Sequence, residues 1–393
     1  MNIQNRTIYH KDNLDILRGI DSETVDLIYL DPPFNTNKTW EGAAGSDAED
    51  ASFKDTWTGD DIKKEWVDAI RAEHVELHKF LSGMKFWAGE SDVAYITYMA
   101  VRIIECRRIL KSTGSLYYHC DHYMNDYVKV MLDIIFGRHH DVNNLVWTYG
   151  LGGSSKRAFS KKHDNIFLYS KTKDYYFNKP QVPATSSAMK GKMKGMPDVF
   201  TDIPSLNNMA KERTGYPTQK PLALLRRLIG AACPEDGIVL DPFCGCATTC
   251  VAAEQLGRQW IGIDVSIKAY ELVKDRLDID AASDLFEERV ITYRNTAPIR
   301  SNSDSRESKY VYVISNAAFP DEYKVGIASN FKSRLNGYQT SDPNRAYKEE
   351  FKMLTPDYRE IEKFIHEKFP NKHEWVQAPL EDIIEEIRQS KIW

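Results

Sequence analysis

Four consecutive residues of this chain have the chemistry to hold the exocyclic amine of a nucleobase: Asp31, Pro32, Pro33 and Phe34. A carboxylate and a backbone carbonyl that accept the two N–H groups return electron density to a poorly nucleophilic nitrogen. Proline has a fixed φ and no N–H donor, so it holds such a carbonyl rigidly. An aromatic ring can stack on a base turned out of a duplex. The pattern predicts an amine pocket, with a simple strand-ending turn as the alternative.

These residues need an element to position them, and the apolar segment 25–30 directly before them is expected to be a strand. Ligands bind at the carboxyl ends of strands in open α/β sheets. Residues 237–249 are expected to form a strand, a tight turn and the start of a helix. Residues 260–264 are expected to form a further strand that ends in an acidic residue. Small residues allow close approach of a ligand, a helix N-terminus favours an anion, and the acid suits ribose hydroxyls. A third segment, 216–221, opens a helix over 222–232.

The three segments, which follow one another in the chain as 25–34, 216–221 and 237–264, resemble the DNA amino-methyltransferases of the beta group, across the first three-quarters of the chain. The resemblance is closest to type III modification subunits and their solitary relatives. It implies a Rossmann-like α/β fold with a mostly parallel sheet, and S-adenosylmethionine as methyl donor. With an aspartate at position 31, the motif resembles that of the adenine-N6 branch of the family, whereas a serine there would indicate methylation of cytosine N4.

The resemblance also implies roles for individual residues. Asp31, Pro32, Pro33 and Phe34 form the amine pocket. Four places on the cofactor are implied. Asp12 lies near the adenine, Asp264 binds the ribose, and Thr218 and Lys220 lie near the methionine end. The loop that lines the cofactor site carries Asp241, Phe243 and Gly245. Asp12 has a second interpretation as a helix N-cap.

The cofactor loop departs from the family pattern at one position, because Ala247 replaces its last glycine. Alanine would be strained there by roughly 1 kcal/mol if the backbone needs a positive φ. We expect that the position needs only a small side chain. The nearby Cys244, Cys246 and Cys250 suggest a metal at first sight, but no fourth Cys or His is close in the sequence and all three fall on the cofactor loop, so we expect no metal there.

Composition limits the remaining possibilities. The 393 residues predict more than one domain, and the 42% hydrophobic content is enough for real cores. No apolar stretch is long enough for a transmembrane helix, and the N-terminus lacks a signal-peptide core. Six cysteines in a chain of this length favour a reducing cytoplasm over a disulfide scaffold.

Positive charge is concentrated in the window 148–215, which holds 12 Lys and Arg against five acidic residues, although the whole chain carries −5. Aromatic residues are interleaved with the basic ones. The window lies where relatives carry their target-recognition region, so we expect it to bind double-stranded DNA. The candidate phosphate contacts are Lys156, Arg157, Lys161 and Lys162, behind a glycine-rich loop at 150–155. Residues 35–61 are expected to form a mobile loop that closes over the flipped base or stays disordered.

The methyltransferase part is expected to span residues 1–294, followed by a polar linker at 295–308 and a small α+β domain at 309–393. The last part resembles the GIY-YIG nucleases. The resemblance implies Tyr312 as nucleophile or base, Arg334 on the phosphate, and Glu362 as ligand of a metal such as Mg²⁺. Lys324 stands where the family has its second tyrosine, so cleavage and mere binding of DNA both stay open.

Three functions remain from the sequence alone. The first is an adenine-N6 methyltransferase with an appended nuclease-like domain, and cytosine N4 is its nearest variant. The second is a nuclease that uses the methyltransferase half for recognition. The third is a DNA-binding protein without catalysis. RNA as substrate, the recognition sequence, and the choice between monomer and homodimer are left open.

Overall fold

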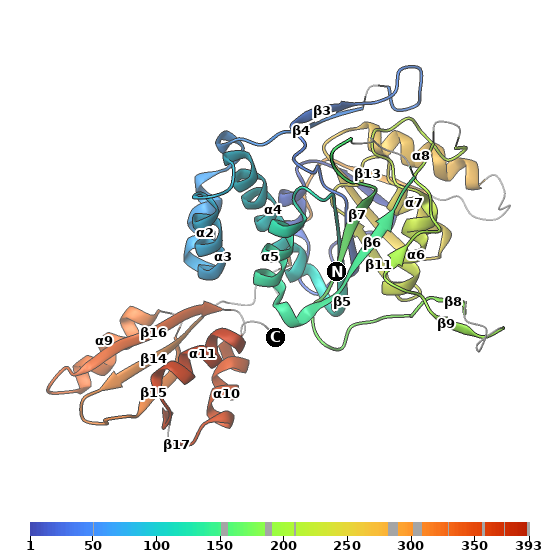
Figure 1. The fold of residues 1–393 in the computed structure, drawn as a ribbon. Coiled ribbons are helices and arrows are strands. Elements are labelled where there is room, and N and C mark those ends of the chain that lie inside the picture. The colour runs from blue at the N-terminus through green and yellow to red at the C-terminus, as the bar shows by residue number, and fades with distance from the viewer. Residues whose placement is uncertain are drawn as a thin grey trace. The chain divides into compact units, whose positions relative to one another are not determined.

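The computed structural model describes two compact units, Met1–Ser301 and Asn302–Trp393, within which these residues are placed: 1–49, 51–150, 156–184, 191–207, 210–281, 290–301, 309–328, 330–355, 358–372 and 374–390 (Figure 1). Each unit has its own apolar core. No helix among the placed residues is long and apolar enough to cross a membrane.

A nine-stranded sheet forms the centre of the first unit. Its strand order is β10-β6-β7-β5-β2-β11-β12-β1-β13. The strands are β1 (Thr7–His10), β2 (Val25–Leu30), β5 (Leu110–Cys120), β6 (Asp141–Thr148), β7 (His163–Ser170), β10 (Val199–Phe200), β11 (Ile238–Asp241), β12 (Gln259–Asp264) and β13 (Thr292–Arg294). Strand β7 runs antiparallel to β5 and β6, and the other pairs are parallel. The predicted α/β class with a mostly parallel sheet is therefore confirmed.

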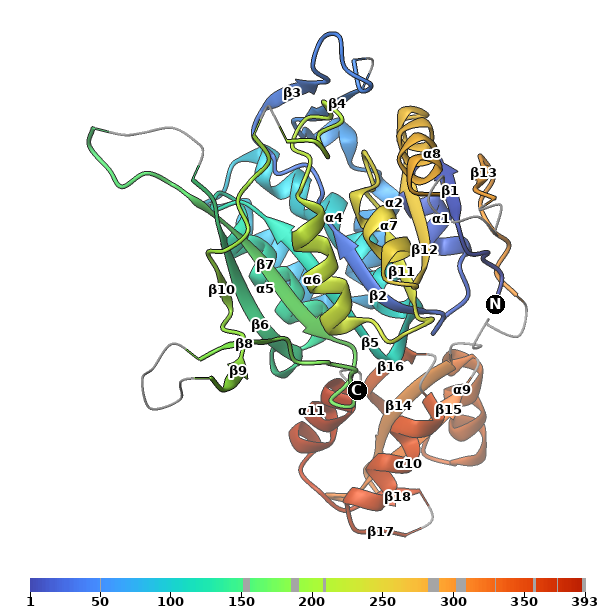
Figure 2. The ribbon, with the colours of Figure 1, turned by 90° about the vertical axis from the view of Figure 1, so that its right-hand side faces the viewer.

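Helices cover both faces of this sheet (Figures 1 and 2). Ile28 and Leu30 of β2 point into the core on one face, and Leu27 and Tyr29 point into the core on the other. Such burial on both sides explains why β2 is a continuous apolar run. The first face carries α1 (Asn13–Gly19), α2 (Lys64–Glu73), α3 (Val75–Met84), α4 (Glu90–Ile109) and α5 (Asn125–Phe136). The second carries α6 (Leu222–Ala232), α7 (Thr248–Gln255) and α8 (Lys268–Ala281).

Strands β2, β11 and β12 are parallel neighbours, and this places three acidic residues at one edge of the sheet. Leu240 pairs with Ile28 on one side and with Ile261 on the other. The chain leaves β2 toward β5 and leaves β11 toward β12, in opposite directions. A crevice for ligands is expected where the strand order diverges in this way.

The segment that follows the amine pocket is a hairpin of β3 (Lys38–Glu41) and β4 (Ser52–Asp55), where we expected a mobile loop. Asp55 is only 2% exposed. Its carboxylate accepts hydrogen bonds from the backbone N–H groups of Asn35 and Thr36 and from the indole of Trp40. One buried carboxylate therefore orders the turn into the hairpin, because its oxygens need these donors once they are out of water.

The basic window contains a second small hairpin, β8 (Gln181–Pro183) with β9 (Met193–Gly195). The predicted linker begins later than expected. Residues 295–301 are attached to the first unit, since Asn2 donates to the carbonyl of Ile299 and the backbone N–H of Ser301 donates to Asp21. The rest of the predicted linker, residues 302–308, lies outside the placed residues.

The second unit is a small α+β domain around a five-stranded antiparallel sheet of order β16-β14-β15-β18-β17. Its elements are β14 (Lys309–Asn316), β15 (Tyr323–Ala328), α9 (Phe331–Ser341), β16 (Tyr347–Thr355), α10 (Tyr358–Lys368), β17 (Asn371–Lys372), β18 (Trp375–Val376) and α11 (Leu380–Ser390). Helices α10 and α11 pack on one face through Ile361, Ile365, Ile383 and Ile387.

Ala247 adopts a left-handed backbone conformation, with φ +54° and ψ +35°, directly before α7. We expected that this position would need only a small side chain, and that expectation is wrong. The loop must turn sharply between β11 and α7, and Ala247 is the residue that makes the left-handed step. An L-residue is strained there by roughly 1–2 kcal/mol.

Ala247→Gly should relieve that strain and lose about 0.8 kcal/mol for one buried methyl group. We therefore expect the free energy of unfolding, measured by urea titration, to stay unchanged or to rise by up to about 1 kcal/mol. Ala253→Gly is the matched control, because Ala253 is equally buried but lies inside α7. It should lower the same free energy by about 1–2 kcal/mol. Equal losses in both variants would show that Ala247 is not strained.

Candidate active site

A cavity of about 390 Å³ opens at the edge of the sheet where β2, β11 and β12 end. It brings together residues from all three sequence segments. Its lining includes Asp31, Pro32, Pro33, Phe34, Thr218, Lys220, Asp241, Phe243, Gly245 and Asp264. Segments more than 200 residues apart in the sequence thus share one chamber, whose size is within the range of small-molecule sites.

Asp12 does not line this cavity, although its neighbours Lys11 and Asn13 do. Its carboxylate accepts the backbone N–H of Leu14 at the start of α1, as an N-cap does, and it pairs with the buried guanidinium of Arg102 at 3.0 Å. The alternative interpretation as a helix cap describes these contacts.

The carboxylate of Asp31 has one occupied oxygen and one vacant one. Oδ2 lies 2.7 Å from the ammonium nitrogen of Lys220. Oδ1 is buried and has no hydrogen-bond partner among the placed residues. A buried acceptor without a donor is unfavourable by about 1–3 kcal/mol, so this oxygen is suited to receive an N–H group from a ligand.

Lys220 contacts both Asp31 and Phe34, and its place at the methionine end of the cofactor stays a prediction. Its ammonium binds Asp31 and stands 5.2 Å from the centre of the Phe34 ring. Thr218, whose φ is +60°, makes the turn that carries this lysine to Asp31. The sequence gives no signal for this pairing, because 189 residues separate the two partners.

The ring of Phe34 stacks on the imidazole of His119 at 6.1 Å between centres, with 29° between planes. His119 is fully buried and lies between the hydroxyl of Tyr29, 2.9 Å from Nδ1, and the carboxylate of Asp164, 3.1 Å from Nε2. Tyr149 donates to the other oxygen of Asp164. Such a closed buried network fixes the orientation of the ring behind Phe34.

The charge at Asp164 follows from this network. Burial alone would raise the pKa of the Asp164 carboxyl, but hydrogen bonds from His119 and Tyr149 and the charge of Lys220 outweigh it and lower the pKa. Both ring nitrogens of His119 therefore have hydrogen-bond partners, and the nearby Asp121 accepts the backbone N–H of Tyr123.

The other half of the cavity holds two carboxylates that end β11 and β12. Asp264 accepts the backbone N–H groups of Gly245 and Ser266, each at 2.8 Å. Asp241 accepts the N–H of Phe243 at 3.0 Å. Burial raises the pKa of Asp264 above its ordinary value, and burial together with the charges of Asp31 and Asp264 raises the pKa of Asp241 to about 7.

The loop backbone comes close to Tyr216 at Gly245. Its φ is +49°, and a Cβ there would lie 2.9 Å from the Tyr216 ring. A strand-end carboxylate beside a loop with no room for a side chain suits a nucleoside with free ribose hydroxyls. These residues therefore fit the cofactor that the sequence implies.

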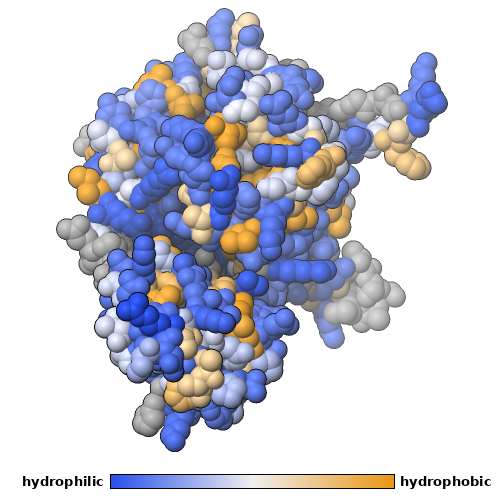
Figure 3. Space-filling model, turned by 90° about the vertical axis from the view of Figure 1, so that its left-hand side faces the viewer, coloured by the Kyte–Doolittle hydropathy of each residue, from blue (hydrophilic) through white to orange (hydrophobic). Residues whose placement is uncertain are grey.

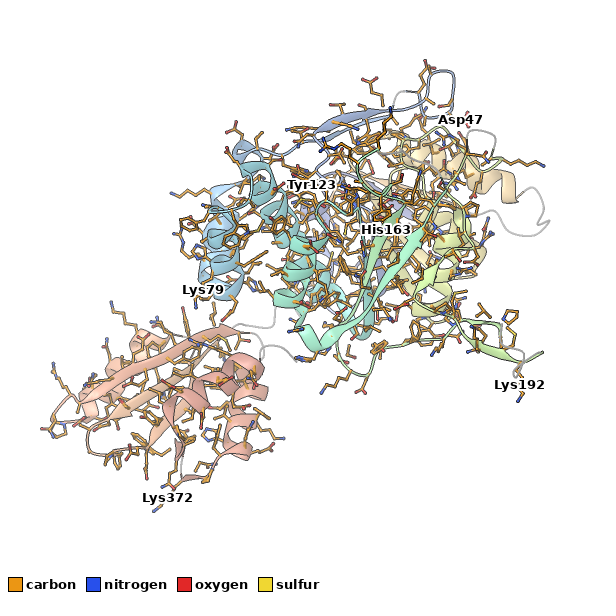
Figure 4. All side chains as sticks on the ribbon, in the orientation of Figure 1. Asp47, Lys79, Tyr123, His163, Lys192 and Lys372 are labelled. Atoms are coloured by element: carbon orange, nitrogen blue, oxygen red, sulfur yellow. The ribbon has the colours of Figure 1, made fainter. Side chains whose placement is uncertain are left out.

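Aromatic residues that the sequence analysis missed cover the cavity. Trp40 and Phe53 of the β3–β4 hairpin line it, and the Phe53 ring stacks on Tyr216 at 6.4 Å and 17°. The alternation of residue types in 38–41 and 52–55 could have indicated the two strands. Figure 4 shows this hairpin, which carries Asp47, at the end of the sheet where Tyr123 and His163 lie.

The predicted phosphate contacts lie on the connection between β6 and β7. Lys156, Arg157 and Lys161 are exposed and Lys162 is half-buried. The glycine-rich loop predicted at 150–155 falls outside the placed residues except for Gly150. The six cysteines are buried and form no disulfide, and the placed residues hold no cluster of three His, Cys, Asp or Glu that could bind a metal.

In the C-terminal unit, three of the four predicted residues, Tyr312, Lys324 and Arg334, lie around Tyr338. The Tyr312 hydroxyl lies 2.9 Å from that of Tyr338 and accepts from Arg334 at 3.4 Å. Lys324 forms an ion pair with Glu374 at 2.6 Å. Burial raises the pKa of Glu362, and the charge of nearby Glu374 raises it further.

Comparison with known protein families matches residues 25–275 to the DNA methylase family N6_N4_Mtase. The chain therefore belongs to this family of DNA methylases. Residues 309–391 match the T5orf172 domain. The GIY-YIG resemblance of this part stays a prediction.

The individual relatives that the chain resembles are also methyltransferases. The chain is 27% identical to the type II methyltransferase M.ScaI of Streptomyces caespitosus over 293 residues, which is 70% of this chain and 82% of the relative. It is also 27% identical to the DNA adenine methyltransferase YhdJ of Escherichia coli K12 over 290 residues, 70% and 83% of the two chains. Among solved structures, the cytosine-N4-specific PvuII DNA methyltransferase aligns over 74% of this chain and 89% of its own, with 14% identity and a TM-score of 0.48.

The raised pKa of Asp241 predicts a pH effect on stability in the absence of ligand. The folded pKa, about 7, exceeds the ordinary value of 3.8, so the folded state binds the proton more tightly. Stability contributed by this group therefore falls as pH rises from about 4 to about 7. Asp241→Asn removes the charge and should raise the free energy of unfolding at pH 8 by about 1–3 kcal/mol, with the gain fading toward pH 4.

Urea titrations at several pH values measure this difference. Asp174→Asn, at an exposed carboxylate, is the control and should leave the pH profile unchanged. A gain for Asp241→Asn that is equal at pH 4 and pH 8 would contradict the account.

Proposed function

We propose that this chain transfers a methyl group from S-adenosylmethionine to the N6 amine of adenine in DNA. The observation that carries the proposal is the vacant, buried Oδ1 of Asp31 in a cavity shared with Asp241 and Asp264. Asp31 thus lines the same chamber as these two carboxylates.

Different residues of the chain have different roles in the proposed reaction. Oδ1 of Asp31 and the carbonyl of Pro32 accept the two N–H groups of the amine, which makes its nitrogen a better nucleophile. Phe34 stacks on the base, and Asp31 is placed to take the proton that the amine loses. Lys220 holds Oδ2, so the carboxylate keeps one orientation without a base. S-adenosylmethionine, when bound, supplies a methyl group on a sulfonium centre, and Asp264 accepts its ribose hydroxyls.

Aspartate before the Pro-Pro step favours adenine N6, and the likeness to a DNA adenine methyltransferase of E. coli supports this choice. Cytosine N4 is the alternative. The exposed basic residues of the β6–β7 connection suit duplex DNA, since Lys and Arg bind phosphates without reading sequence. The type II relatives favour a role in restriction and modification over the type III setting that the sequence suggested.

Asp31→Ala should lower the rate of tritium transfer from labelled S-adenosylmethionine to DNA by about 10²–10³-fold, since it removes an acceptor used in the transition state. Its cofactor affinity, measured by calorimetry, should stay close to wild type. Asp264→Ala should show the reverse pattern in calorimetry and bind the cofactor weakly, because its carboxylate faces the ribose.

Asp31→Ala leaves the ammonium of Lys220 buried without its acceptor, so Asp31→Asn serves as control for folding. It keeps a neutral acceptor and should also lose activity. Normal turnover in both variants, or loss of cofactor binding in folded Asp31→Ala, would contradict the assignment.

For the C-terminal unit we propose a GIY-YIG-like centre that cleaves DNA with a divalent metal such as Mg²⁺. The cluster of Tyr312, Tyr338 and Arg334, with the charged Lys324 beside it, supports a phosphate site. Glu362 would hold the metal. Burial raises the pKa of the Tyr312 phenol, and Tyr338 raises it further, so Tyr312 needs the metal nearby to act as a base.

The full chain should nick supercoiled plasmid with Mg²⁺ or Mn²⁺ and not with EDTA. Glu362→Ala and Arg334→Ala should each remove nicking without changing the circular dichroism spectrum, because the metal needs the carboxylate and the phosphate needs the cation. Glu367→Ala, at an exposed glutamate of the same helix, should nick normally. Absent or metal-independent nicking would leave the unit as a DNA-binding domain.

A further inference from the structure

The connection between β6 and β7 carries an aromatic side chain that no part of the proposed reaction uses. Phe159 is 100% exposed, the highest value among the large apolar side chains of the placed residues. Exposed Lys156, Arg157 and Lys161 surround it in the sequence. The placed part of this connection projects away from the body of the first unit (Figures 2 and 3). An apolar ring held in water among cations indicates a polyanionic partner with an apolar interior.

The base of this connection is joined to the wall of the amine pocket. The backbone N–H of Tyr149 donates to Lys162 across the two chain segments. The hydroxyl of Tyr149 donates to Asp164, and Asp164 holds His119, on which Phe34 stacks. Three buried or half-buried contacts thus lead from the connection to the ring that would receive the base.

The contacts at the start of β7 are also rigid. Asp164 is 7% exposed and His119 is fully buried, and both are held by hydrogen bonds. The connection therefore begins at a fixed place beside the pocket, although its far end is in solvent. A side chain carried on it can enter the duplex only close to the nucleotide whose base occupies the pocket.

A base that leaves the duplex costs a few kcal/mol of stacking and pairing, and proteins offset part of this by inserting an apolar side chain into the base stack. We propose that Phe159 enters the space that the target base vacates, while Lys156, Arg157, Lys161 and Lys162 hold the flanking phosphates. This inference rests on the proposed function, since it requires a flipped base in duplex DNA.

The test compares two oligonucleotide duplexes that contain the recognition sequence, which is first mapped from modified bases in DNA exposed to the protein. In one duplex the target adenine is paired with thymine, and in the other it faces an abasic site. Phe159→Ala should methylate the paired target about 10- to 100-fold more slowly than wild type. On the unpaired target, where extrusion is already easy, it should stay within about threefold of wild type.

Three further variants separate a wedge from simpler roles. Phe159→Trp keeps a large ring and should retain most of the activity on the paired duplex. Lys161→Ala removes a phosphate contact, so it should weaken binding of both duplexes equally and reduce the salt dependence of binding. Phe86→Ala, at an 88% exposed phenylalanine between α3 and α4, should change nothing.

The outcomes are distinguishable. Equal rates of Phe159→Ala and wild type on the paired target, or an equal loss on both targets, would overturn the proposal. A loss on both targets together with a changed sedimentation coefficient would assign Phe159 to contact with a second copy of this chain. Failure of wild type to methylate either duplex would instead refute the proposed function.

Discussion

The parallel registry of β2, β11 and β12 is the constraint on which the site depends. Because Leu240 pairs with both Ile28 and Ile261, the three strands end together, and Asp31, Asp241 and Asp264 are held at one edge of the sheet. Three carboxylates in one cavity repel one another, and the raised pKa of Asp241 reflects this repulsion together with its burial. The protein tolerates the cost because the cores on both faces of the sheet fix the strands.

Two buried polar side chains, Asp55 and His119, fix the positions of residues outside the sheet. Asp55 fixes the hairpin that covers the cavity, and His119 fixes the ring of Phe34 from behind. Each needs several hydrogen bonds to be buried, so each holds its neighbours in one arrangement. The β3–β4 hairpin and the β6–β7 connection are therefore both tied to the 31–34 segment, although neither belongs to the sheet's parallel core.

The sequence predicted the parts of the site that depend on strand ends. Asp31, Asp241 and Asp264 each follow or end an apolar run, so their common edge could be deduced from the fold class. It did not predict the pairing of Lys220 with Asp31, because a contact between residues so distant in sequence depends on how the 212–221 segment turns. The strain at Ala247 and the hairpin at 38–55 were also misjudged, since composition indicates loops but not their backbone conformation. In the C-terminal unit the pattern predicted a small α+β domain and three of the residues around Tyr338, but not their chemistry.

Identification of the methylated nucleoside tests the central claim most directly. DNA incubated with the full chain and S-adenosylmethionine is digested to nucleosides, which are separated by chromatography and identified by mass spectrometry. The arrangement of Asp31, Pro32 and Phe34 predicts N6-methyladenine. N4-methylcytosine would keep the amine chemistry and correct the base, whereas 5-methylcytosine, or no methylated nucleoside under conditions where the cofactor binds, would contradict the account.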